Sequence, residues 1–232
     1  MATLRILSAG AAQAVAEKII EAFRRDTGHS VIAHFGAVGA MKAKMAAGEP
    51  VDVIILTQPM IDELIGAGLV QDGSRIDLGR VGTGVAVRAG NDLPDVTSVD
   101  ELRERIRTAS SIAFPDPAVA TAGKVVMSLF EQLGVLEEVR PRMSFFPNGY
   151  AAMKWLAAST GSDELGITQV TEILPNPGVA YAGPLPDEFQ MKAVYSVGVV
   201  AQSSQPTIAK TFAARFSSAS VRALLVDAGY EL

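Results

Sequence analysis

The chain has 232 residues, of which 49% are apolar and 19% charged, a composition typical of a folded globular protein rather than a disordered or fibrous one. The formal charge is −5, and Lys and Arg do not gather in any one segment, which excludes nucleic acid as an expected partner. Cysteine is absent, so disulfides, Cys-ligated zinc, iron–sulfur clusters and a thiolate nucleophile are excluded. With only His29 and His34 available, we expect no metal site.

The first third of the chain alternates short apolar strands with helices. From residue 12 onward the apolar side chains fall at helical spacing, and Gly28 follows in the manner of a helix cap. Three such strand–helix units in about 70 residues are typical of a parallel sheet covered by helices, so we predict an α/β fold. The predicted strands are residues 4–8, 31–35 and 52–56, and the predicted helices are residues 12–27, 40–47 and 59–67.

The sequence changes character near residue 80, and the middle third predicts a second lobe. Residues 80–88 predict an extended, glycine-containing segment, and the capping box Ser98-Val99-Asp100-Glu101 opens a helix that runs to about residue 107. The remaining predicted elements are strands at 111–114, 143–146 and 164–168, helices at 121–133 and 148–158, an extended segment at 192–202, and closing helices at 206–216 and 220–228.

Sequence motifs for nucleotide binding and for serine hydrolysis are missing. The phosphate-binding pattern G-x-x-x-x-G-K-[ST] does not occur, and Gly82-Thr83-Gly84 lacks the third glycine of a dinucleotide fingerprint. There is also no G-x-S-x-G elbow. We therefore expect no cofactor.

No segment approaches the run of roughly 18 apolar residues that spans a bilayer, so we expect no membrane insertion. Residues 5–16 end in Ala14-Val15-Ala16 and superficially resemble a signal peptide, but Ser8, Gly10 and Gln13 interrupt the apolar stretch. We expect a cytoplasmic protein on this basis. The alternative is a periplasmic protein whose leader has been removed.

Four predicted helices begin without an acidic residue. Because helix N-termini carry positive partial charge, a purely structural helix tends to place Asp or Glu in its first turn. Two predicted helices follow this rule, one through Asp100 and Glu101 and the other through Asp62 and Glu63. The four that do not follow it start at residues 11–14, 40–44, 122–125 and 148–152.

Each of these four starts follows a loop of small residues, which leaves backbone N–H groups accessible to an anion. Lys42, Lys44 and Lys124 add positive charge, which is unfavourable near a helix N-terminus unless an anion lies close by. The pattern predicts a site for one small anion. The alternative is that small residues merely permit tight turns and that the lysines point into solvent.

Several short motifs, each weak alone, follow one another in a specific order across nearly the whole chain. The motifs are Leu7-Ser8-Ala9-Gly10-Ala11, Phe35-Gly36-Ala37-Val38-Gly39-Ala40, Gly48-Glu49-Pro50-Val51-Asp52-Val53, Asp116-Pro117 with Thr121-Ala122-Gly123, Leu165-Gly166-Ile167, and a terminal pattern through Phe216, Leu224 and Gly229-Tyr230. With them the chain resembles the solute-binding proteins of ABC transporters, in particular the periplasmic molybdate-binding, ModA-like branch with the bilobal type II periplasmic-binding-protein fold.

The resemblance implies an α/β protein of two lobes, each a central sheet flanked by helices. Lobe I would comprise residues 1–81 plus 192–232 and lobe II residues 82–191, with the ligand in a cleft between them. It further implies a monomer that binds a small anionic ligand and, if exported, works with an ABC permease. The ligand-binding residues expected on this basis are Gly10, Ala11, Val38, Gly39, Thr121, Ala122, Lys124, Asn148, Gly149, Tyr150 and Gln169.

The sequence departs from the molybdate-binding pattern at three positions. Gly10 and Val38 stand where the family has serine, and Gln169 where it has tyrosine. Neutral donors hold molybdate in such sites, and each lost donor costs about 1 kcal/mol or more. Since Lys124 offers a longer, charged donor, we expect a di- or tricarboxylate rather than molybdate or another tetrahedral oxyanion.

An enzymatic alternative remains open, because the same fold is similar to that of aconitate isomerases. Such a protein would isomerise a small polycarboxylate by proton transfer and would need one positioned base but no cofactor. The candidate bases are Lys124, Asp116 and His34, the last read as a half-buried strand residue. A cytoplasmic ligand-sensing module is a third possibility.

Overall fold

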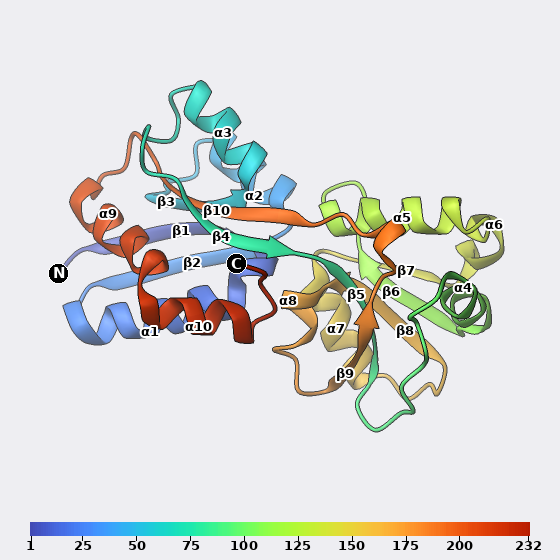
Figure 1. Cartoon of the computed structure of the whole chain (residues 1–232). Helices are drawn as coiled ribbons and strands as arrows, with labels where there is room; N and C mark the ends of the chain where they lie inside the picture. Colours follow the sequence, from blue (N-terminus) through green and yellow to red (C-terminus); the bar gives the residue numbers. More distant parts are fainter. The chain divides into compact units, whose positions relative to one another are not determined.

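The computed structural model describes residues 1–232 and divides the chain into two units. Unit 1 comprises Met1–Val81 and Ala193–Leu232, and unit 2 comprises Gly82–Lys192. Each unit is built on a five-stranded sheet of mixed direction with helices packed against it (Figure 1). This architecture confirms the predicted α/β class.

The sheet of unit 1 has the strand order β2-β1-β3-β10-β4. β1 pairs in parallel with β2 and β3, whereas β10 runs antiparallel to β3 and β4. The carboxyl ends of β1, β2 and β3 therefore share one edge of the sheet, where Tyr195 of β10 lies opposite Thr57. The strands are β1 (Thr3–Ala9), β2 (Ser30–Gly36), β3 (Val53–Thr57), β4 (Ile76–Val81) and β10 (Ala193–Val199).

The helices of unit 1 cover this sheet with apolar faces. Helix α1 buries Val15, Ile19 and Phe23 and ends at Gly28, whose φ of 70° favours glycine. The Phe23 ring meets Phe212 of α9 edge to face, with 5.2 Å between ring centroids. Figure 1 shows α1 and α10 together on one side of the sheet and α3 on the other. The helices are α1 (Gln13–Thr27), α2 (Val38–Ala46), α3 (Gln58–Gly66), α9 (Pro206–Ala214) and α10 (Ala219–Asp227), with short 3-10 turns η1 (Gly10–Ala12) and η4 (Arg215–Ser217).

The sheet of unit 2 has the order β7-β6-β8-β5-β9. β6 pairs in parallel with β7 and β8, while β5 runs antiparallel to β8 and β9. The carboxyl ends of β6, β7 and β8 thus share an edge with the start of β5, where Thr83 pairs with Gln169. The strands are β5 (Thr83–Arg88), β6 (Ser111–Pro115), β7 (Met143–Phe146), β8 (Glu164–Gln169) and β9 (Val179–Pro184).

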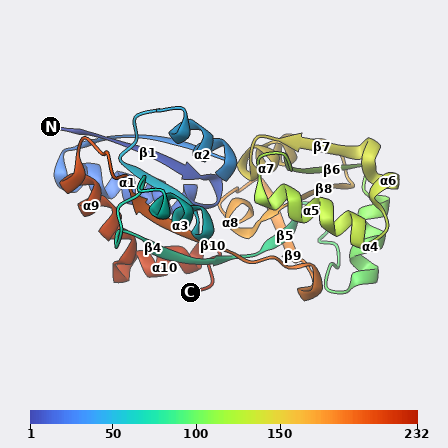
Figure 2. The same ribbon diagram turned by 90° about the horizontal axis from the view of Figure 1, so that it is seen from above.

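Alternation along the strands of unit 2 divides its core between the two sheet faces. Val85 and Ile112 pack with α4 and α5, whereas their neighbours Ala86 and Ala113 pack with α7 and α8. In Figure 1, α5 lies above the strands of this sheet, and α7 and α8 lie to the lower left of it; Figure 2 shows the same elements from above. The helices are α4 (Val99–Thr108), α5 (Thr121–Gln132), α6 (Leu136–Val139), α7 (Gly149–Ala158) and α8 (Val170–Ile173), with 3-10 turns η2 (Arg140–Arg142) and η3 (Asp187–Phe189).

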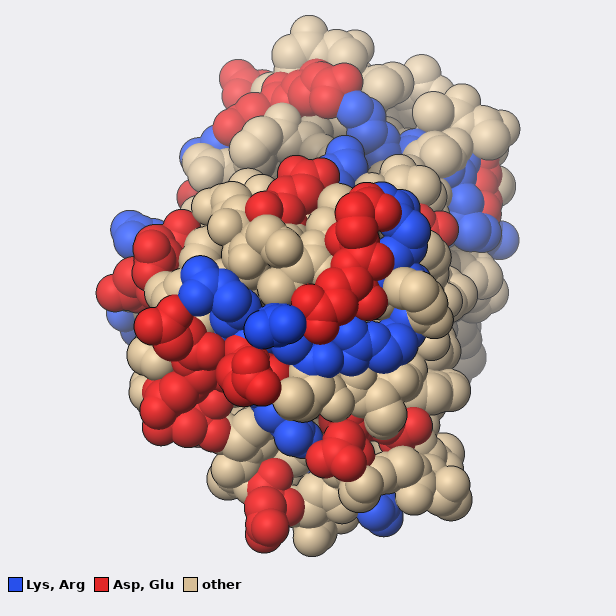
Figure 3. Space-filling model, turned by 90° about the vertical axis from the view of Figure 1, so that its right-hand side faces the viewer, with Lys and Arg blue, Asp and Glu red and all other residues tan.

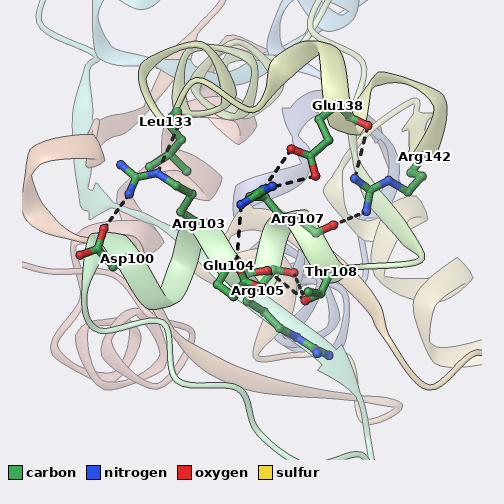
Figure 4. A network of polar contacts seen from close by, with 9 residues as sticks. All are labelled: Asp100, Arg103, Glu104, Arg105, Arg107, Thr108, Leu133, Glu138 and Arg142. Atoms are coloured by element: carbon green, nitrogen blue, oxygen red, sulfur yellow. Dashed lines mark hydrogen bonds and ion pairs between the residues drawn. The ribbon is translucent and has the colours of Figure 1, made fainter.

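The surface of unit 2 around α4 and α6 carries interleaved charges. Figure 3 shows Lys and Arg lying among Asp and Glu on this side rather than in a patch of their own. Arg107 pairs with Glu138 at 3.0 Å, and Arg140 pairs with Glu137 at 2.6 Å. Arg142 donates to the main-chain oxygens of Arg107 and Glu138 (Figure 4). It also donates to the main-chain oxygen of Ala109 at the end of α4.

We expect Arg142→Ala to lower the free energy of unfolding by about 1.5 kcal/mol, because it leaves carbonyls at the end of α4 without a donor and removes a cation from the negative end of that helix. Urea denaturation checks this. Arg222→Ala, on an exposed position of α10, is the control for loss of an arginine side chain. Equal unfolding curves for the two variants would contradict the capping role.

One helix start differs from the sequence prediction. α3 begins at Gln58 with Pro59 in its first turn, so Asp62 and Glu63 fall in the second turn and no acid lies in the first. The prediction that these two acids lie in the first turn, where a negative charge is favourable, is therefore wrong. Instead, Asp62 pairs with Arg75 and Glu63 with Lys42.

Candidate functional site

Three helix starts gather at the carboxyl edge of the unit 1 sheet. The 3-10 turn η1 with α1 follows β1, α2 follows β2 and α3 follows β3. None of these starts has an acidic residue in its first turn, and none has a side-chain cap. The structure thus places Gly10 and Ala11 at the first start, and Val38 and Gly39 at the second. Their backbone N–H groups are the donors that such an edge offers to an anion.

Lys42 and Lys44 do not contribute free charge to this edge. The Lys42 ammonium lies 2.5 Å from Glu63, and the Lys44 ammonium lies 2.9 Å from Glu49. They occupy the fifth and seventh positions of α2, beyond its first turn. The prediction that they need a bound anion to offset the helix dipole is therefore wrong, because glutamates of the same unit neutralise them.

A buried tyrosine fixes the first of these helix starts. The hydroxyl of Tyr230 donates to the main-chain oxygen of Ala11 at 3.0 Å, in a buried contact between residues 219 positions apart. The C-terminal segment therefore holds η1 in place.

Removal of this hydroxyl in Tyr230→Phe is expected to lower the free energy of unfolding by about 1 kcal/mol, since the Ala11 carbonyl loses its donor. Chemical denaturation measures the loss. Tyr181→Phe serves as the control, because no hydrogen bond from the half-buried Tyr181 hydroxyl is present. A loss no larger than that of the control would rule out the proposed tether.

At the corresponding edge of unit 2, α5 begins against the end of β6. A Cβ atom at Gly123 would lie 2.2 Å from the Pro115 oxygen, so glycine permits this close approach. The start has no side-chain cap and no acid in its first turn. Thr121 is half-buried and Ala122 is buried, while Lys124 in the same turn is exposed and forms no ion pair. Lys124 is thus a free cation beside an uncapped helix start.

The start of α7 is occupied from within the protein. The Asn148 side-chain oxygen accepts from the Ala151 N–H at 2.9 Å, and the Gly149 N–H donates to Glu172 at 3.1 Å. Glu172 belongs to α8 and is 4% exposed. The sequence shows no acid in the first turn of α7, but the fold brings one there from 23 residues downstream. The Gly149 N–H is therefore not available to a ligand in this structure.

Glu172 has a strongly perturbed acidity. Burial raises the pKa of its carboxyl to about 7, and hydrogen bonds from the Thr168 hydroxyl and from the backbone of Gly149, Tyr150 and Gln169 offset part of that rise. The Thr168 hydroxyl donates to the carboxyl at 2.7 Å. Sequence reasoning missed this residue, although a Thr-x-x-x-Glu spacing directly after an apolar strand was its visible signal.

The two remaining predicted ligand residues lie at the same edge. Gln169 ends β8 and is 4% exposed, and Tyr150 is the second residue of α7 and is half-buried. Each unit therefore gathers its predicted residues at one sheet edge.

Two of the three candidate bases, Asp116 and His34, lie next to other groups of the protein. The Asp116 carboxylate accepts from the Ala118 N–H at 2.8 Å and so stabilises the turn after β6. The His34 side chain is 52% exposed within β2, with Nε2 3.7 Å from Glu49, so it is a strand residue about half of whose side chain is covered, as expected. Among the candidates, Lys124 alone combines a free charged group with a helix start at the sheet edge.

Comparison with known proteins places the chain among proteins of the same fold. A family model described as bacterial extracellular solute-binding protein matches residues 4–231. An aconitate isomerase from Pseudomonas sp is 27% identical over 234 residues, covering 98% of this chain and 87% of that protein. The periplasmic molybdate-binding protein of Azotobacter vinelandii has a TM-score of 0.83 at 20% identity, covering 99% of both chains. The sulfate-binding protein SubI of Mycobacterium tuberculosis H37Rv has a TM-score of 0.77 at 19% identity, covering 99% of this chain and 86% of that one.

None of the helices has the length and apolar character needed to cross a membrane.

Proposed function

The chain belongs to the bacterial extracellular solute-binding protein family, and on that premise we propose that it binds a small organic anion, a di- or tricarboxylate, at the carboxyl edges of its two sheets. The observation that carries the proposal is the start of α5. There an uncapped helix terminus without acids lies beside Lys124, a lysine with no ion pair. Backbone N–H groups and one ammonium together suit a carboxylate.

The residues of unit 1 favour the same class of ligand. Its uncapped helix starts at Gly10 and Val38 supply backbone donors but no side-chain hydroxyl. A compact oxyanion such as molybdate requires many short neutral donors around it, whereas a longer polycarboxylate can reach separate helix starts with separate carboxylates. The similarity to an aconitate isomerase along 98% of the chain supports a polycarboxylate. The molybdate-binding and sulfate-binding structures share the fold and make tetrahedral oxyanions the alternative ligands.

The site residues proposed for this ligand follow from the helix starts. We keep Gly149 as a residue that shapes the α7 start, because its N–H donates to Glu172. The full proposed set is Gly10, Ala11, Val38, Gly39, Thr121, Ala122, Lys124, Asn148, Gly149, Tyr150 and Gln169.

A second candidate function is the isomerisation of a polycarboxylate, favoured by the 27% identity to an aconitate isomerase. A base would remove a proton from the carbon next to a carboxylate, the double bond would shift along the three-carbon unit, and the proton would return at its other end. No oxidant or reductant enters this balance. Lys124 is the candidate base.

A calorimetric titration tests the binding proposal. The ligands are tricarballylate, trans-aconitate, succinate, molybdate and sulfate, each added to the full chain at pH 7. We expect tricarballylate and trans-aconitate to bind more tightly than molybdate and sulfate. Binding of molybdate alone would overturn the carboxylate proposal.

Proton NMR of trans-aconitate during prolonged incubation decides the second candidate function, isomerisation. New vinyl signals of the cis isomer indicate turnover, and their absence excludes it.

The proposed partner follows from the same premise. If the protein is exported, we propose that it acts as a monomer and delivers its ligand to an ABC permease. Pull-down of detergent-solubilised ABC permeases with the full chain, with and without tricarballylate, tests the interaction.

A further inference from the structure

Glu172 is a buried carboxyl without a countercharge. One oxygen accepts from the Gly149 N–H at 3.1 Å and the other accepts from the Thr168 hydroxyl at 2.7 Å. Backbone N–H groups of Tyr150 and Gln169 add further hydrogen bonds. None of the contributions to its acidity comes from a Lys, Arg or His side chain. Three residues proposed to bind the anion, Gly149, Tyr150 and Gln169, therefore lie next to the buried carboxyl of Glu172.

The contact between this carboxyl and α7 leaves no space for a ligand group. A Cβ atom added at Gly149 would lie 2.0 Å from a Glu172 carboxyl oxygen and 2.2 Å from the Thr168 hydroxyl oxygen. The side chain of Asn176 donates to the main-chain oxygen of Glu172 at 2.6 Å, which fixes the end of α8. The groups that face the carboxyl from α7, β8 and α8 are thus backbone N–H groups and a hydroxyl. Among the residues that bond to the carboxyl, Tyr150 has a titratable side chain. Strand β9, which also packs against α8, carries Tyr181.

On the basis of the proposed function, we propose that Glu172 is a positioning residue that determines where the ligand's charge can bind. Its carboxyl occupies the N-terminus of α7 from inside unit 2 and thereby directs an anionic ligand to the start of α5 and Lys124. The favourable end of α7 is satisfied within the protein, and any nearby ligand meets the charge of Glu172 instead.

This arrangement makes ligand affinity depend on the protonation of Glu172. When the carboxyl is neutral it does not repel an anion, and when it is ionised it does. We expect ionisation of Glu172 to weaken the binding of an anionic ligand by about fivefold in total, since like charges repel one another within unit 2. Because burial raises the pKa of Glu172 to about 7, the change falls between pH 6 and pH 8.

The test compares tricarballylate affinity at pH 6 and pH 8 for the wild type, Glu172→Gln and Glu131→Gln. Glu172→Gln can keep both contacts, since its oxygen accepts from Gly149 and its NH2 group donates to Thr168. We expect this variant to bind at pH 8 about fivefold more tightly than the wild type and with less change between the two pH values. Glu131→Gln, at an exposed position of α5, removes the same charge and should behave as the wild type. Equal affinities of Glu172→Gln and the wild type at pH 8 would overturn the inference.

A second measurement uses the wild type alone and does not depend on the folding of a variant. NMR titration of the Glu172 carboxyl carbon, with and without saturating tricarballylate, reports the same coupling from the other side, because linkage is reciprocal. A fivefold effect predicts a rise of about 0.7 in the pKa of Glu172 on binding. An unchanged midpoint overturns the inference even if tricarballylate binds. Absence of binding by any member of the ligand panel would instead refute the proposed function.

Discussion

Replacement of Lys124 with methionine is expected to weaken tricarballylate binding by about thirtyfold, or about 2 kcal/mol, because a charge-assisted contact to a carboxylate contributes roughly that amount. The stability of the protein should change little, since the Lys124 side chain is exposed and forms no ion pair. Calorimetric titration gives the affinity, and urea denaturation gives the free energy of unfolding.

Lys154→Met is the matched control, because Lys154 is an exposed lysine of the same unit, on α7, and its replacement changes the net charge equally. We expect this variant to bind as the wild type does. If Lys124→Met also retained full affinity, Lys124 would be removed from the site, and the start of α5 would lose its role as the centre of the proposal.

Glu172→Gln is expected to remove a large pH dependence of stability. The carboxyl has a pKa of about 7 in the folded protein against an ordinary value of 4.5. The folded state thus keeps a proton that the unfolded state has already released between these values. In the wild type, Glu172 therefore lowers the free energy of unfolding as pH rises from about 4.5 to about 7, by about 3 kcal/mol in total. Above pH 7 its contribution stays level.

The measurement is the free energy of unfolding of both proteins at pH 5, 6, 7 and 8. The difference between wild type and Glu172→Gln isolates this one carboxyl, because all other groups titrate equally in the two proteins. We expect the wild type to lose stability relative to the variant across this range. Parallel pH profiles would show that Glu172 has an ordinary acidity.

Much of the fold could be predicted because its elements are defined by local patterns. α1 follows from the spacing of Val15, Ile19 and Phe23 and from the cap at Gly28. The edge strands β4 and β9 were missed, because neither has a sustained apolar run: β4 contains Gly79 and Arg80, and β9 is only half-buried. A strand of this kind is stabilised by pairing with β10 or β5, which the local sequence does not show.

The candidate site was less predictable because charge neutralisation is a property of the fold. The rule that links anion sites to helices without acids considers only neighbours in sequence. The Gly149 N–H bonds with Glu172, 23 residues away, and Lys42 pairs with Glu63, 21 residues away. Lys124 has no such partner, and its place in the ligand site stays a prediction.

Amide NMR mapping of tricarballylate on the full chain tests the central claim most directly. The account predicts that the largest chemical-shift changes occur at the proposed helix starts, around Gly10, Val38 and Thr121, with a smaller change at the N–H of Gly149, which Glu172 already occupies. Changes confined to the opposite edges of the sheets would contradict it.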